Sequence, residues 1–120
     1  MPTKKAIGDR GEALAQKYLE SKKYEILECN WRYSRAEIDI IAKHEDILIF
    51  VEVKTRSYDY YGQPENAVNP GKEAMIIDAA QRYMEHIDYE WQIRFDIISI
   101  ILDKNLNVNQ LKHFEDAFFY

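Results

Sequence analysis

The sequence has one cysteine, Cys29, among its 120 residues, so an internal disulfide is excluded. A single thiol also cannot supply the several cysteine ligands of a zinc cluster. Only four glycines and three prolines occur, and the glycines form no phosphate-binding loop. These absences exclude a disulfide-stabilised fold, a cysteine-based metal cluster and a glycine-rich nucleotide site.

Long hydrophobic runs are also missing, because no run approaches the roughly 20 residues that a membrane helix needs. The apolar run at residues 47–51, for example, ends at the charged Glu52. Residues 1–5 lack the apolar stretch of a signal peptide. We therefore expect a cytoplasmic protein with no membrane partner, folded as one domain over residues 1–120.

The charge balance is acidic. Sixteen lysines and arginines stand against 21 aspartates and glutamates, which gives a formal net charge of −5. This balance argues against a general nucleic-acid binder, which is usually basic. It leaves room for a local positive patch, because carboxylates that hold cations add to the negative total.

Apolar periodicity predicts the element order α-β-β-β-α-β-β. We expect helices at residues 6–23 and 70–86, and strands at 24–33, 37–43, 47–56, 92–103 and 108–112. Asn69 and Pro70 are a typical cap and first residue for the second helix. The third strand is apolar on both faces in its first half, which is typical of a central strand covered by helices. The sequence therefore predicts the α/β class, with a mixed sheet flanked by helices.

The hairpin between the second and third strands brings ionisable residues together. A two-residue turn pairs His44 with Ile47 and, counting back, places Asp39 opposite Glu52. Because side chains alternate along a strand, Lys54 falls on the same face as Glu52. Like charges that lie opposite each other repel, and burial increases the cost unless a cation intervenes.

A hard divalent cation, Mg²⁺ or Mn²⁺, suits such a group, because it binds carboxylates, backbone carbonyls and water. Asp39, Glu52 and the carbonyl of Val53 are candidate ligands. Lys54 would then orient or help to deprotonate the attacking water, or stabilise a charged transition state. Alternatively, Lys54 only neutralises the two carboxylates. Glu37 shares the face of Asp39. It either supports the metal ligands or is a solvated residue at the start of its strand, and we favour the second interpretation.

Glu12 is a fourth candidate for the site. It shares a helix row with Ala15 and Leu19, and that row points inward if Leu19 is buried. A glutamate on this row would face the carboxylates of the hairpin and complete a metal site. Alternatively, Asp9 and Glu12 have the spacing of a capping box for a helix that begins at Asp9. The residues alone leave both interpretations open.

Four further residues are candidates for contact with nucleic acid. Arg56 continues the face of Lys54, and Lys72 starts the second helix, where backbone amides favour anions. Tyr60 and Tyr61 lie in the loop that follows the third strand and can stack on splayed bases. The alternatives are a surface ion pair for Arg56, a solvated side chain for Lys72, and packing of the tyrosines on the core or in a dimer contact.

Several blocks of the sequence resemble the bacterial YraN family. They are GDRGE at residues 8–12, NWR at 30–32, EIDIIA at 37–42 and FVEVKTR at 50–56, with later matches at 94–96 and 117–118. That family is described as predicted endonucleases, similar to archaeal Holliday junction resolvases, within the PD-(D/E)xK nuclease superfamily. The resemblance implies a restriction-endonuclease-like fold, in which a mixed sheet is flanked by helices.

The resemblance also implies a function. It assigns metal-site roles to Glu12, Asp39 and Glu52 and a catalytic role to Lys54, while Ala36 stands where the family usually has glycine. It implies a Mg²⁺-dependent endonuclease that acts on DNA, including branched or damaged DNA. The alternatives are a nucleic-acid-binding module with little or no cleavage, and a protein-interaction domain, which the net charge favours. A homodimer would suit the cutting of two strands.

Overall fold

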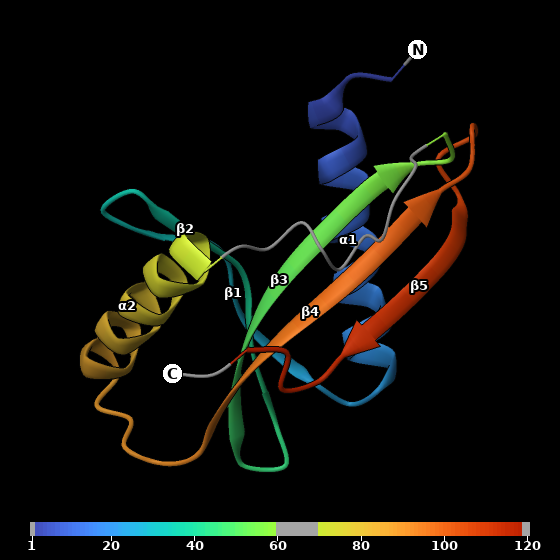
Figure 1. Cartoon of the computed structure of the whole chain (residues 1–120). Coiled ribbons are helices and arrows are strands. Elements are labelled where there is room, and N and C mark those ends of the chain that lie inside the picture. Colours follow the sequence, from blue (N-terminus) through green and yellow to red (C-terminus); the bar gives the residue numbers. More distant parts are fainter. Residues whose placement is uncertain (1, 60–69, 119–120) are drawn as a thin grey trace.

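The computed structural model describes residues 2–59 and 70–118 (Figure 1). Within them the elements are α1 (Lys4–Ser21), β1 (Glu25–Tyr33), β2 (Ala36–His44), β3 (Ile47–Ser57), α2 (Pro70–His86), β4 (Ile93–Leu102) and β5 (Val108–Phe114). The order is the predicted one, and each boundary lies within two residues of its predicted position. The predicted loop residues 60–69, with the expected cap Asn69, and residues 119–120 lie outside the described range.

Helix α1 begins two residues earlier than predicted, because Thr3 is its N-cap. The Thr3 hydroxyl accepts a hydrogen bond from the Ala6 N–H at 3.0 Å, which satisfies one of the unpaired amides of the first turn. Asp9 therefore lies inside the helix and forms an ion pair with Lys5 at 2.8 Å. The capping-box interpretation of Asp9 and Glu12 is wrong.

The five strands form one mixed sheet in the order β1-β2-β3-β4-β5. β3 and β4 are parallel, and the other neighbouring pairs are antiparallel. Helix α2 lies in the connection between β3 and β4, as parallel neighbours require a crossover (Figure 1). The predicted α/β class, with a mixed sheet flanked by helices, is confirmed.

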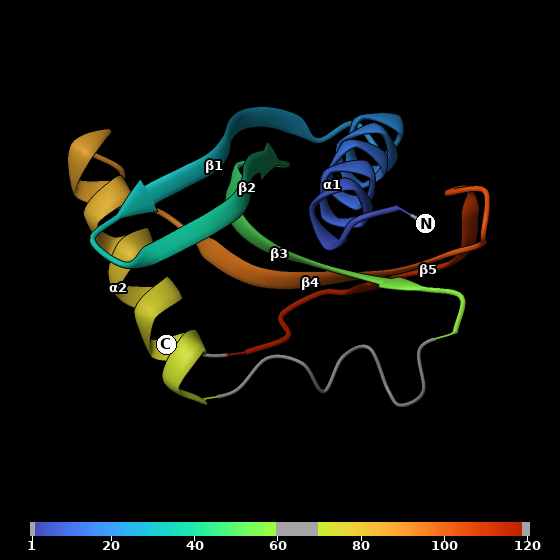
Figure 2. The ribbon, with the colours of Figure 1, turned by 90° about the horizontal axis from the view of Figure 1, so that it is seen from above.

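Each helix covers a different face of the sheet (Figure 2). Ala15 and Leu19 of α1 pack with one set of buried strand residues, which includes Val51 of β3. Tyr83 of α2 packs with another set, which includes Phe50 of β3. β3 is therefore buried on both sides, as predicted for a central strand. None of the helices in the described residues has the length and apolar character needed to span a membrane.

The last described residues close the core beside α2. Phe118 is buried, and its ring stacks on that of Phe95 with the centroids 4.9 Å apart. The Ala117 N–H also donates a hydrogen bond to the Phe95 carbonyl at 2.7 Å. Phe118 therefore forms part of the core that α2 covers.

Candidate functional site

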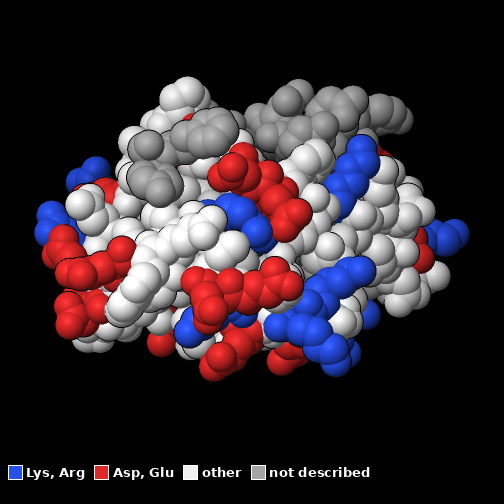
Figure 3. Space-filling model, turned by 90° about the horizontal axis from the view of Figure 1, so that it is seen from below, with Lys and Arg blue, Asp and Glu red and all other residues white. Residues whose placement is uncertain are grey.

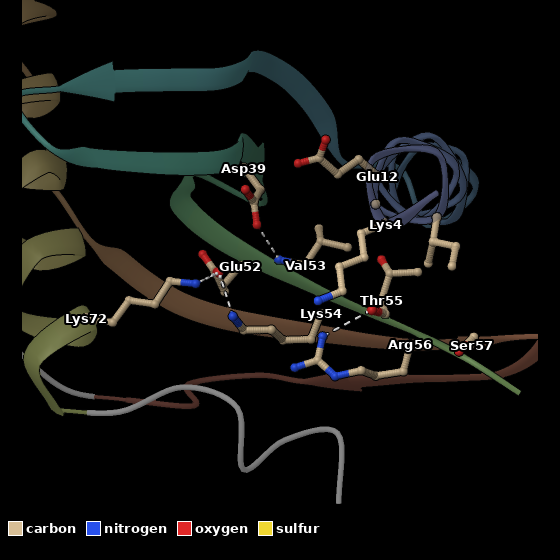
Figure 4. Close-up of a pocket in the computed structure, with 12 residues that line it drawn as sticks. Lys4, Glu12, Asp39, Glu52, Val53, Lys54, Thr55, Arg56, Ser57 and Lys72 are labelled. Carbon is tan, nitrogen blue, oxygen red and sulfur yellow. Dashed lines mark hydrogen bonds and ion pairs between the residues drawn. The ribbon is translucent and has the colours of Figure 1, made fainter. Parts of the chain in front are cut away.

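A cleft of about 650 Å³ opens between the N-terminal half of α1, the end of β3 and the start of α2 (Figure 4). Its lining includes all the described residues that were predicted for the site: Glu12, Asp39, Glu52, Val53, Lys54, Arg56 and Lys72. Tyr60 and Tyr61 lie outside the described residues. Residues that are distant in sequence thus meet around one concave surface.

The cleft forms where β2 and β3 separate. Their pairing has the predicted register and extends as far as Ile40 opposite Val51. At the next position Asp39 does not pair with Glu52, so the prediction that these two residues lie opposite each other in the ladder is wrong. Instead, the carboxylate of Asp39 accepts a hydrogen bond from the Val53 N–H at 2.8 Å. A side chain thereby replaces a backbone acceptor, which lets the strands diverge.

Asp39 is strongly perturbed by its surroundings. Burial and the charge of Glu52 raise its pKa to about 8, although the hydrogen bond from the Val53 N–H acts in the opposite direction. A carboxyl group in such a place binds a proton near neutral pH unless a cation takes the proton's place. A nearby positive charge, such as that of Lys72, favours the charged form of Asp39 instead.

Glu12 reaches the cleft because α1 packs very closely on β3 at the preceding residue. Gly11 is buried, and a Cβ atom there would lie only 1.8 Å from the Thr55 hydroxyl oxygen. The missing side chain lets the two backbones approach, and Glu12 then points from α1 toward Asp39 (Figure 4). Burial raises the pKa of Glu12 and the charge of Glu37 adds to this effect, although a hydrogen bond with Asp39 acts in the opposite direction. The structure agrees with the inward-facing interpretation of Glu12.

Three carboxylates form a cluster at one side of the cleft. Glu12, Glu37 and Asp39 each offer an oxygen, and these three atoms lie within 4.8 Å of one another. The side-chain amide of Asn30, with its nitrogen toward the acids, donates to both Glu12 and Glu37 at 3.1 Å. Arg32 also pairs with Glu37 at 2.6 Å. The sequence favoured a solvated position for Glu37, but the structure places it beside Glu12 and Asp39. Its spacing of two residues from Asp39 was the only sequence signal for this position.

Glu52 is held differently, by two lysines. The same oxygen, Oε1, lies 2.5 Å from Lys72 Nζ and 3.2 Å from Lys54 Nζ. The Glu52 side chain is 5% exposed, so this charge is almost fully removed from water. Burial, together with the neighbouring Lys72, lowers the pKa of Lys54. The alternative interpretation of Lys72 as a solvated side chain is therefore incomplete, because its ammonium group contacts Glu52.

Comparison with known proteins places the chain in a family. A family model described as "Uncharacterised protein family UPF0102" matches residues 11–100. The chain belongs to this family. A UPF0102 protein of Christiangramia forsetii is 46% identical over 114 residues, covering 95% of this chain and 94% of the relative. UPF0102 proteins of Flavobacterium psychrophilum and Alkaliphilus oremlandii are each 44% identical and cover 95% of this chain and 94% and 98% of their own lengths.

The sequence resemblance to the YraN family is confirmed, because YraN and UPF0102 denote the same family. The description of the family names no activity.

The donor atoms of the cleft fit a hard divalent cation. The clustered carboxylates of Glu12, Glu37 and Asp39 are close enough to bind one. In a strand, the N–H and C=O of one residue point to the same side, so the Val53 carbonyl faces the same side as its N–H, toward Asp39. All these donors are oxygen atoms, which Mg²⁺ and Mn²⁺ prefer over softer ligands.

Cationic side chains also gather at the cleft. Lys4, Lys54, Arg56 and Lys72 line it, and Arg56 donates a hydrogen bond to the backbone carbonyl of Thr55 at 3.1 Å. Lys4 was not among the residues predicted for the site. Elsewhere the charges are mixed: acidic and basic side chains are interspersed on the face drawn in Figure 3. The cleft thus brings four basic side chains together with the carboxylates of Glu12, Asp39 and Glu52.

Proposed function

We propose that the protein is a metal-dependent endonuclease that hydrolyses phosphodiester bonds of DNA. The observation that carries this proposal is the convergence of Glu12, Asp39, Glu52 and Lys54 on one cleft. The carboxylates of Glu12, Asp39 and Glu52 and the Val53 carbonyl would hold Mg²⁺ or Mn²⁺. When bound, such a cation supplies charge stabilisation at a phosphate and lowers the pKa of a water molecule.

Lys54 is suited to move a proton. Its side chain is 12% exposed, and burial lowers the pKa of its amino group toward the range in which proton transfer at neutral pH is efficient. Glu52 holds the amino group at 3.2 Å, so its position in the cleft is defined. Lys54 would therefore orient the attacking water and neutralise the charge that develops on the phosphate.

The other cations of the cleft would bind the nucleic-acid backbone. Lys4, Arg56 and Lys72 line the same space as Lys54, and lysine and arginine are the usual partners of phosphate oxygens. These contacts position a strand without reading its sequence. We expect substrates to be selected by their structure, with branched or damaged DNA as the first candidates from the family resemblance.

A second candidate function is a DNA-binding module that retains the cleft but does not cleave. The double lysine contact to Glu52 favours it, because a carboxylate neutralised in this way is a weaker ligand for a metal. The two candidates share the cleft and differ only in catalysis.

The test is cleavage of labelled duplex, single-stranded and branched DNA with Mg²⁺ or Mn²⁺. We expect the wild type to cleave only with metal, Asp39→Asn to be inactive, and Lys54→Met to lose about 100-fold in rate. Asp78→Asn is the matched control, because Asp78 lies on α2 outside the cleft with its side chain 57% exposed.

Three results would change the proposal. Salt-dependent DNA binding without cleavage would establish the binding module. If the protein neither binds nor cleaves any of these substrates, both candidates are refuted. Cleavage by Asp39→Asn at the wild-type rate would refute the assignment of the site.

A further inference from the structure

The contact between Lys72 and Glu52 joins two elements across the cleft (Figure 4). Lys72 extends from the first turn of α2, and Lys54 extends from β3. Both ammonium groups lie on the same oxygen of Glu52, at 2.5 and 3.2 Å. One buried carboxylate therefore already has two positive partners.

A divalent cation at Glu52 would add a third positive group to this oxygen. Like charges a few ångströms apart repel strongly in a partly buried site, so one ammonium group has to leave. The Lys54 side chain is 12% exposed, whereas that of Lys72 is 39% exposed. Lys72 has solvent to move into and a long flexible stem, so it is the group that leaves.

The released lysine would remain in the cleft. Lys72 lines the same space as Lys54 and Arg56, and it lies near the start of a 17-residue helix, where backbone amides also favour anions. Once the ammonium group of Lys72 has lost its carboxylate partner, another anion is its most favourable new partner. A phosphate group in the cleft is such a partner.

We propose that Lys72 is a displaceable counter-ion of Glu52. It occupies the carboxylate in the metal-free protein, is released when a divalent cation binds, and then binds a phosphate of the nucleic acid. The proposal rests on the proposed function, because it takes Glu52 as a metal ligand and nucleic acid as the anion. Its consequence is that metal and nucleic acid bind cooperatively through Lys72.

The first experiment titrates the metal-free protein with Mn²⁺ and follows free Mn²⁺ by electron paramagnetic resonance. Lys72→Met removes the competitor, so we expect it to bind Mn²⁺ roughly two- to fivefold more tightly than the wild type, the range for a partly exposed ion pair. Lys72→Arg keeps the charge and should remain close to the wild type. Lys17→Met is the matched control on an exposed site of α1 outside the cleft.

The second experiment measures binding of a labelled single-stranded oligonucleotide by fluorescence anisotropy at constant ionic strength, with and without Mn²⁺. Mn²⁺ should strengthen binding to the wild type severalfold, and most of this gain should disappear in Lys72→Met. Thermal unfolding of each variant verifies that it is folded.

The outcomes separate this proposal from the endonuclease. In one outcome, Lys72→Met binds Mn²⁺ more tightly and loses cooperativity, but no variant cleaves DNA. This result supports the counter-ion role of Lys72 and refutes the endonuclease activity. Cleavage by the wild type with unchanged Mn²⁺ affinity in Lys72→Met overturns the counter-ion and leaves the nuclease. If neither the wild type nor Lys72→Met binds Mn²⁺, the counter-ion role of Lys72 is also refuted.

Discussion

Alanine substitutions at two glycines of α1 are expected to have opposite effects on stability. Replacing glycine by alanine inside a helix gains about 1 kcal/mol. At Gly8 an added Cβ meets nothing within 4 Å, so Gly8→Ala should obtain this gain. At Gly11 the same atom would lie 1.8 Å from Thr55 Oγ1 and 2.6 Å from Thr55 Cγ2. Gly11→Ala should therefore force α1 away from β3.

The size of the effect follows from these distances. Ordinary van der Waals contact starts at 3.4 Å, so the helix or Thr55 has to move by roughly 1.5 Å. Overpacking of this kind costs about 1–3 kcal/mol. Both variants share the helix gain, so they should differ by this overpacking cost, about 2 kcal/mol, or on the order of 10 °C in Tm. The same displacement moves Glu12 away from Asp39, so Gly11→Ala should also weaken Mn²⁺ binding.

Urea denaturation followed by circular dichroism measures both variants, and a Mn²⁺ titration measures the site. Gly11→Ala combined with Thr55→Ala should recover part of the stability, because it removes the two closest atoms and leaves Thr55 Cβ at 2.7 Å. Equal stability of Gly8→Ala and Gly11→Ala would refute the close approach of α1 to β3.

Two further predictions concern buried groups. Burial alone would raise the pKa of Asp96, but hydrogen bonds from His113, Arg94 and a backbone N–H lower it below the ordinary value of 3.8. Asp96 therefore stabilises the fold above pH 3.8 and loses this effect as the pH falls through its folded pKa. Asp96→Asn should lower stability at neutral pH and flatten its acid dependence in urea titrations, and an unchanged acid slope would contradict this role. Phe50 is 1% exposed, so Phe50→Ala should cost about 3–5 kcal/mol, whereas Trp91→Ala, at 71% exposure, should change the free energy of unfolding by less than about 0.5 kcal/mol.

The sheet could be predicted from the sequence because its signals are local. The apolar pattern of β3 on both faces indicated a central strand, and the short polar turn after His44 set the register of the β2–β3 hairpin as far as Ile40 and Val51. Alternation along β3 placed Glu52 and Lys54 on one face, and the structure finds them 3.2 Å apart. Periodicity and turn length act over a few residues, so no distant contact was needed.

The composition of the candidate site could be predicted only in part. The sequence pointed to Glu12, Asp39, Glu52 and Lys54, partly through family resemblance, and all four line one cleft. Counting along the hairpin wrongly placed Asp39 opposite Glu52. Counting residues along a hairpin assumes that each backbone N–H donates to a backbone carbonyl of the partner strand. Here the Val53 N–H donates to the Asp39 side chain instead, so the pairing ends before Asp39.

By itself, the sequence therefore determined the element order, the central strand and which face of β3 carries the charged residues. The tertiary structure alone decided which carboxylates meet and which are neutralised. Glu37 reaches Asp39, Glu12 depends on the contact of Gly11 with Thr55, and Lys72 crosses from another element to Glu52. The physical reason is range: side-chain alternation is set by neighbouring residues, whereas burial and charge pairing depend on how a helix docks on a sheet many residues away.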